Sequence, residues 1–92
     1  MTGQISTRLA ELGIELPQAP APVAAYVPYV QTGNLVFISG QISILDSNEI
    51  GTGVVGNDLT PEQGQQAARN SAINTLAHLR NACGSDLDKV RR

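Results

Sequence analysis

One four-residue segment restricts the possible folds of this chain more than any other. Residues 35–38 read Leu-Val-Phe-Ile, so every position of the strand expected there is apolar. A strand that buries one face alternates apolar and polar side chains, whereas a strand covered on both faces reads as a continuous apolar run. A chain of 92 residues can cover one face of such a strand with its own helices. We therefore expect the other face to meet another subunit.

The composition is that of one globular domain. Hydrophobic residues make up 41% of the chain and charged residues 15%, which is typical of folded rather than disordered proteins. The formal net charge of −2 gives no attraction to phosphate polyanions. Two tyrosines and one phenylalanine are too few for a base-stacking platform. We expect a single domain over residues 1–92 that binds no nucleic acid. We also expect no membrane association, because the sequence lacks the apolar run of about 20 residues that a membrane helix needs.

Cysteine and histidine usage indicates neither a disulfide nor a metal site. Cys83 is the only cysteine and His78 the only histidine, so an internal disulfide is impossible and a metal centre of the usual composition is not expected. We expect no cofactor. The first residues lack the apolar run of a signal peptide, and a cytoplasmic location is the expectation.

The N-terminal quarter predicts a short helix followed by a connector. Leu9 and Leu12 lie three residues apart in the segment 6–12, and Gly13 can end the helix. Residues 17–22 read Pro-Gln-Ala-Pro-Ala-Pro, which favours extended backbone. We therefore assign residues 1–21 to an N-terminal helix and a proline-rich connector.

The next segments predict a β-hairpin and a glycine-rich stretch. Residues 25–31 and 35–41 flank Thr-Gly-Asn, and Pro28 cannot donate to a strand ladder, so the first strand is expected to start late or lie at an edge. Residues 41–45 extend this run, and residues 46–49 are turn-like. Three glycines then bracket Val54 and Val55, without the Gly-Lys-Ser/Thr of a nucleotide loop.

A long helix is the clearest local prediction. Thr60 and Gln63 form a capping-box pattern around a proline at the first helical position, and Gly84 follows the expected last residue, Cys83. The predicted apolar stripe, which we expect to face the sheet, consists of Ala68, Ala72, Leu76, Leu79 and Cys83. His78 lies off this stripe and is expected to be exposed to solvent.

Several segments together resemble the RidA family, also called the YjgF or endoribonuclease L-PSP family. They include Ala24–Val30, the Gly-Asn-x4-Ser-Gly-Gln run that ends at Gln41, the Gly53–Thr60 segment, and Leu87–Val90. The resemblance runs from about Pro22 to the last residue. Order and spacing make it specific, since a single Ser-Gly-Gln would mean little.

The resemblance implies an α+β fold, a mixed sheet with helices packed on one face, and a homotrimer with clefts between subunits. Family members with known activity hydrolyse enamines and imines, such as 2-aminoacrylate, to keto acids and ammonia. In the family an arginine binds the substrate carboxylate, while backbone groups near the Ser-Gly-Gln turn and a glutamate-positioned water complete the site. The implied ligand is thus a small metabolite that carries a carboxylate.

Three residues match positions of the family cleft. Tyr26 corresponds to a cleft tyrosine, and Ser39 and Gly40 correspond to the turn beside the ligand. Each also has a structural interpretation, namely a tyrosine at the core edge and a strand end that needs small residues. Gln41 is expected to make a structural hydrogen bond.

The family's arginine and glutamate belong to a region downstream of the Leu87–Val90 run. That region would also hold the second helix and last strands, and Arg91 and Arg92 do not match its motif. We therefore predict a domain truncated at its C-terminus, with no catalytic residue among these 92.

Three functions remain open at this point. The first is a RidA-type enamine/imine deaminase that is inactive in this form. The second is a trimeric small-molecule-binding protein without turnover. The third, an endoribonuclease or translation inhibitor, is suggested only by the family's older name and is disfavoured by the charge and the scarce aromatics.

Overall fold

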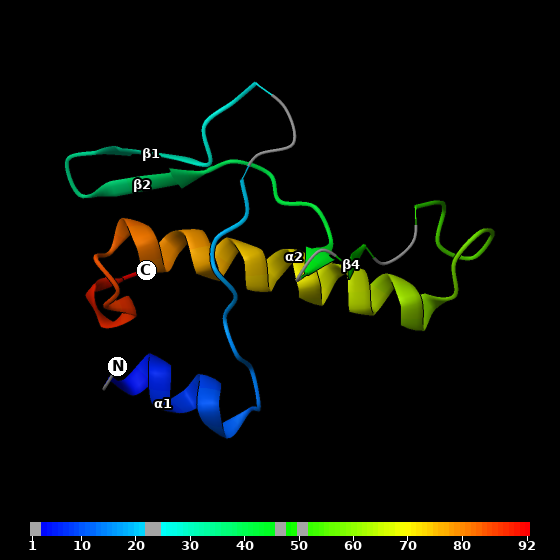
Figure 1. The fold of residues 1–92 in the computed structure, drawn as a ribbon, viewed down its shortest axis with the longest axis horizontal. Helices are drawn as coiled ribbons and strands as arrows, with labels where there is room; N and C mark the ends of the chain where they lie inside the picture. Colours follow the sequence, from blue (N-terminus) through cyan, green and yellow to red (C-terminus); the bar gives the residue numbers. More distant parts are fainter. Residues whose placement is uncertain (1–2, 22–24, 46–47, 50–51) are drawn as a thin grey trace.

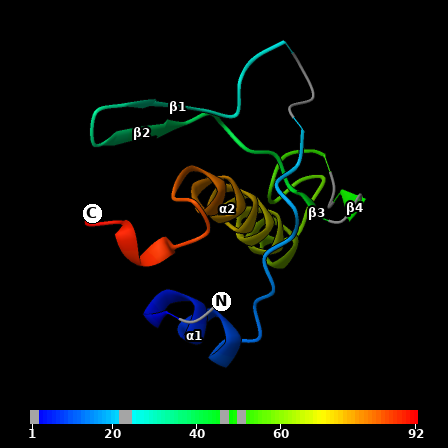
Figure 2. The ribbon, with the colours of Figure 1, turned by 60° about the vertical axis from the view of Figure 1, so that its left-hand side comes forward.

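One long helix organises the chain. The computed structural model describes residues 3–21, 25–45, 48–49 and 52–92. The elements are α1 (Gln4–Glu11), β1 (Tyr29–Thr32), β2 (Leu35–Ile38), β3 (Ile44–Leu45), β4 (Asn48–Glu49), α2 (Pro61–Ala82) and the 3-10 helix η1 (Leu87–Lys89). Both views place the β1–β2 hairpin on one side of α2 and α1 on the opposite side (Figures 1 and 2). The connector between α1 and the hairpin crosses α2 (Figure 1).

The ends of α2 follow directly from its sequence. The Thr60 hydroxyl accepts a hydrogen bond from Gln63 N at 3.2 Å, and the Gln63 side chain accepts one from Thr60 N at 2.8 Å. This capping box satisfies two backbone donors that a helix start leaves unpaired. Cys83 is the C-cap, and Gly84 follows with φ +62°, a left-handed conformation that glycine adopts without strain. The predicted boundaries of this helix are confirmed to within one residue.

The hairpin presents two different faces. β1 and β2 pair antiparallel, with Tyr29 opposite Ile38 and Val30 opposite Phe37, and Gly33 turns the chain with φ +57°. Val36 and Ile38 are half-buried, whereas Phe37 and its neighbour Leu35 are about 60% exposed. The helix therefore covers one face of the hairpin, and the opposite apolar face has no cover within the described part of this chain.

The observed strands confirm the α+β class and refine the prediction. β1 begins only at Tyr29, after Pro28, as the missing proline donor led us to expect. The strands of the described residues form two separate two-stranded antiparallel sheets, β1–β2 and β3–β4. Asn48 and Glu49, predicted as a turn, pair with β3 instead, while Asp46 and Ser47 lie outside the described residues. α1 begins at Gln4, two residues earlier than predicted.

The predicted orientation of α2 is wrong. Ala68 and Ala72 are exposed, and the other three stripe residues are only half-buried. The buried face consists instead of Asn70, Ile73, Asn74, Ala77 and His78. The physical reason lies in what this face of α2 packs against. The face meets extended backbone as well as apolar side chains, and backbone carbonyls require hydrogen-bond donors that alanine and leucine cannot supply.

Two buried asparagines supply these donors. Asn74 Nδ2 donates to the carbonyl of Ile42 at 3.2 Å and also to that of Ile44. Asn70 Nδ2 donates to the carbonyl of Ser43 at 3.3 Å. Both asparagines are 2% exposed. The chain that leaves the hairpin is therefore held against α2 mainly by side-chain amides.

The apolar core is small. Among the described residues the buried hydrophobic ones are Ile73, Ala77 and Leu87. The radius of gyration is 14.3 Å, compared with about 12 Å for a compact domain of this length. Polar contacts to α2 therefore carry a large share of the organisation of this open structure. No helix in the described ranges has the length and apolar character needed to cross a membrane.

Candidate functional site

The two ends of the hairpin meet at Ser39. Its backbone N–H donates to the carbonyl of Pro28 at 2.9 Å and extends the β1–β2 ladder by one bond. Its hydroxyl donates to the carbonyl of Val27 at 2.6 Å. These two bonds fix the backbone that enters β1 against the backbone that leaves β2. Ser39 is thus well positioned, although its hydroxyl hydrogen is already engaged.

Gly40 leaves its side of this turn open. It is exposed, and a Cβ built at this position would meet no heavy atom within 4 Å. A ligand could therefore approach the backbone here closely. Gln41 Nε2 donates to the carbonyl of Ser39 at 3.1 Å, which confirms its predicted structural hydrogen bond and stiffens the turn.

Tyr26 lies on the approach to the same turn. It directly precedes Val27, whose carbonyl accepts the Ser39 hydroxyl hydrogen bond, and it is 41% exposed. The backbone that follows Tyr26 is therefore hydrogen-bonded to the Ser39–Gly40 turn, and both Tyr26 and Gly40 are accessible to solvent. The site offers backbone groups, a hydroxyl and a phenol, but no charge.

His78 corrects the sequence-based prediction most clearly. We expected it to be exposed, but it is 3% exposed, on the buried face of α2. Burial lowers its pKa, and a hydrogen bond with the backbone of Pro20 partly opposes this effect. Proline has no N–H, so the imidazole is the donor. His78 holds the connector together with Arg80, whose Nη2 donates to the carbonyl of Pro17 at 2.8 Å.

The loop before α2 is held by its own hydrogen bonds. Asp58 accepts a hydrogen bond from Val54 N at 2.9 Å, and the N–H groups of residues 57–59 converge on the Val54 carbonyl. Gly53 has φ +152°, and a Cβ there would lie 2.5 Å from that of Asp58. Asp58 therefore closes this loop, which explains the residue without any catalytic role.

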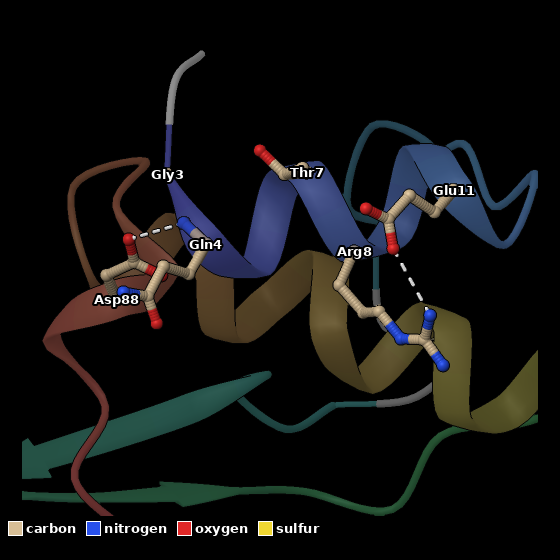
Figure 3. A pocket seen from close by; sticks show the side chains of 6 residues that line it. All are labelled: Gly3, Gln4, Thr7, Arg8, Glu11 and Asp88. Atoms are coloured by element: carbon tan, nitrogen blue, oxygen red, sulfur yellow. Dashed lines mark hydrogen bonds and ion pairs between the residues drawn. The ribbon is translucent and has the colours of Figure 1, made fainter.

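A polar hollow of about 540 Å³ lies beside α1 (Figure 3). Its main polar groups are already paired. The Asp88 carboxylate, from η1, accepts hydrogen bonds from Gln4 N at 2.8 Å and Ile5 N at 3.0 Å, so it caps α1 from the far end of the chain. Arg8 and Glu11 form an exposed ion pair at 3.2 Å. Groups satisfied in this way offer little to a ligand.

Comparison with known proteins places the chain in a family. One family model, described as "YjgF/chorismate mutase-like, putative endoribonuclease", matches residues 6–92. The chain belongs to this family. The resemblance to RidA proteins drawn from the sequence is thereby confirmed.

Two curated relatives of the YjgF chain are similar along most of its length. Protein TCP17 of Trypanosoma cruzi is 41% identical over 91 residues, which cover 99% of this chain and 56% of the relative. A 2-iminobutanoate/2-iminopropanoate deaminase of Dermatophagoides farinae is 36% identical over 78 residues, covering 84% of this chain and 56% of the relative. The chain thus spans about half the length of these relatives.

Two crystal structures share the fold of this YjgF domain. A protein of unknown function from Agrobacterium tumefaciens superposes with a TM-score of 0.83 at 42% identity, over 96% of this chain and 53% of that one. A "putative endoribonuclease" from Shewanella oneidensis gives 0.86 at 33% identity, over 95% and 57%. Both matches support the predicted RidA-like fold class. The chain covers about half the length of each of these two structures.

The buried histidine predicts how stability depends on pH. Because the pKa of His78 is lowered in the folded state, the unfolded chain binds more protons at pH values below about 6.5. The free energy of unfolding should therefore decrease as the pH falls from 7 toward about 5.5, a range above the usual carboxylate pKa values. Urea unfolding at several pH values measures this slope. The variant His78→Gln, which keeps an N–H donor, should flatten it, and an equal slope in both proteins would contradict the assignment.

Proposed function

We propose that the Ser39–Gly40 turn and Tyr26 form one wall of a small-molecule cleft in a RidA-type enamine/imine deaminase. The observation that supports this most is the open backbone at Gly40, which no heavy atom would obstruct within 4 Å of an added Cβ. Ser39 and Gln41 hold that backbone in place through their hydrogen bonds. The deaminase among the relatives, at 36% identity, points to the same chemistry.

The cleft wall would receive the planar, uncharged end of the substrate. Hydrolysis of an enamine or imine needs a positioned water and a group that orients the carboxylate, for which a bidentate arginine is well suited. The resemblance puts the arginine and the glutamate downstream of the Leu87–Val90 run. Because the described site holds no charged group, we infer that the 92 residues bind a small carboxylate weakly and do not turn it over by themselves. RNA cleavage finds no support in a net charge of −2.

We also propose that the exposed face of the hairpin is a subunit interface in a homotrimer. Val30, Leu35 and Phe37 are 53%, 59% and 60% exposed, and Val30 and Phe37 are direct cross-strand partners on this face. A contiguous apolar patch of this kind marks an interaction surface more often than free surface. The cleft of the proposed deaminase would lie between such subunits.

Bulk added at Gly40 tests the proposed cleft. Gly40 has no positive φ, so Gly40→Leu adds a side chain without backbone strain. Pyruvate, the keto acid formed from 2-aminoacrylate, is the unreactive probe. We expect pyruvate to shift the NMR amide signals of residues 26 and 39–41, and Gly40→Leu to remove these shifts. Ala68→Leu, at an exposed alanine of α2, should leave them unchanged.

A kinetic assay completes this test. When 2-aminoacrylate is generated in the reaction mixture, ammonia release should not exceed the uncatalysed rate with these 92 residues. Turnover above that rate that is lost in the Gly40→Leu variant would show that the cleft wall alone is catalytic. It would contradict the predicted inactivity of these 92 residues. Absence of any pyruvate effect at residues 39–41 would refute the cleft itself.

A charge placed on the exposed hairpin face tests the assembly. We expect light scattering to show an association that increases with concentration, because contact with a second copy of the chain would bury the exposed Phe37 side chain. Phe37→Lys should shift the molecular mass to that of a monomer. Leu12→Lys, at the apolar C-cap residue of α1, which is 51% exposed, is the matched control and should leave the mass unchanged. A well-folded unsubstituted monomer at ~100 µM, a concentration at which specific subunit contacts are populated, would contradict the proposal.

A further inference from the structure

A second hollow lies between α1, the segment that follows it and the C-terminal end of α2. Its volume is about 570 Å³, within the range of small-molecule sites. Its apolar lining includes Leu9, Ile14, Leu16 and Leu87. None of the residues of the proposed deaminase cleft lines it, so the two regions are separate.

Polar contacts join the walls of this hollow. α1 contacts η1, where Asp88 caps it through two hydrogen bonds of 2.8 and 3.0 Å. The connector is fixed to α2 by the bond from Arg80 to the Pro17 carbonyl. No residue of α1 is buried. The walls are therefore joined by hydrogen bonds, while the apolar side chains between them remain incompletely packed.

Arg80 gives the hollow a cation. Arg80 is half-buried as a residue. Its guanidinium carries five N–H donors and makes one hydrogen bond in the described structure, to the Pro17 carbonyl. Donors thus remain for a ligand. The other charged lining residue, Glu15, is exposed, so solvent screens its charge more strongly than that of Arg80. A guanidinium beside an apolar wall suits a carboxylate that carries a hydrocarbon chain.

We propose that this hollow binds an aliphatic carboxylate. The carboxylate hydrogen-bonds to Arg80, and the chain lies against Leu9, Ile14 and Leu87. The ligand adds the apolar contacts that α1 lacks in the described structure, and it therefore stabilises the docking of α1 on the rest of the domain.

Three probes separate the two parts of this recognition. Octanoate has both the chain and the carboxylate, octanol has only the chain, and acetate has only the carboxylate. In NMR titrations of the 92-residue chain, octanoate should give saturable shifts of the amides of α1 and of residues 13–16. Octanol should bind about tenfold more weakly, since it lacks the charged hydrogen bonds to Arg80. Acetate should give no saturable shift.

Two variants test the residues. Ala10 lines the hollow, and Ala10→Leu adds apolar volume there without removing any of the hydrogen bonds of the rim, so it should weaken octanoate binding and keep the fold. Arg80→Gln should weaken binding about tenfold, whereas Arg69→Gln, at an exposed arginine of α2, should not. Arg80 also donates a hydrogen bond to the Pro17 carbonyl, so Arg80→Gln could unfold the protein. In that case the Ala10→Leu variant still tests whether octanoate binds in this hollow.

Three outcomes would overturn the proposal. These are equal affinity for octanoate and octanol, undiminished octanoate binding by a folded Ala10→Leu variant, and shifts that map to the exposed hairpin residues Val30 and Phe37 instead of α1. The last outcome would identify the octanoate effect as non-specific adsorption to an apolar surface.

Discussion

The backbone carbonyls of residues 42–44 require hydrogen-bond donors, and α2 supplies them. Asn74 donates to Ile42 and Ile44, and Asn70 donates to Ser43. These hydrogen bonds are part-buried, so a carbonyl that loses its donor there costs up to about 1–3 kcal/mol, and the small apolar core offers little to offset such a loss. The side-chain amides of α2 therefore decide where the chain that leaves the hairpin can lie.

The position of the proposed cleft depends on this arrangement. The Ser39–Gly40 turn stands between β2, which packs on α2, and residues 42–44, which the asparagines hold. Ser39 then joins the turn to the start of the hairpin through its hydrogen bonds to Val27 and Pro28. Further along α2, His78 and Arg80 hold the connector through the backbone of Pro20 and the carbonyl of Pro17. One helix thus fixes two irregular segments with the same chemistry, and α1 is attached beyond them through Asp88.

Local signals made part of this structure predictable. Caps at Thr60 and Gly84 determine α2 through contacts within a few residues, and Pro28 explains the late start of β1. The rotation of α2 was mispredicted because apolar periodicity identifies the buried face only when its partner is apolar. The spacing of Asn70, Asn74 and His78 at four-residue intervals is a polar stripe that could have indicated a face directed at backbone. Asp88 could not have been predicted, since its partners lie more than 80 residues away.

The measurement that tests this account most directly is the urea unfolding of Asn74→Leu. Leucine has a similar volume and is more apolar, so an ordinary hydrophobic contact would be strengthened by this change. The account predicts a loss of about 1–3 kcal/mol in the free energy of unfolding, because two carbonyls lose their donor. Asn81→Leu, at an exposed position of the same helix, should stay within about 0.5 kcal/mol. An Asn74→Leu variant as stable as the unsubstituted chain, or more stable, would contradict the central role of these amides.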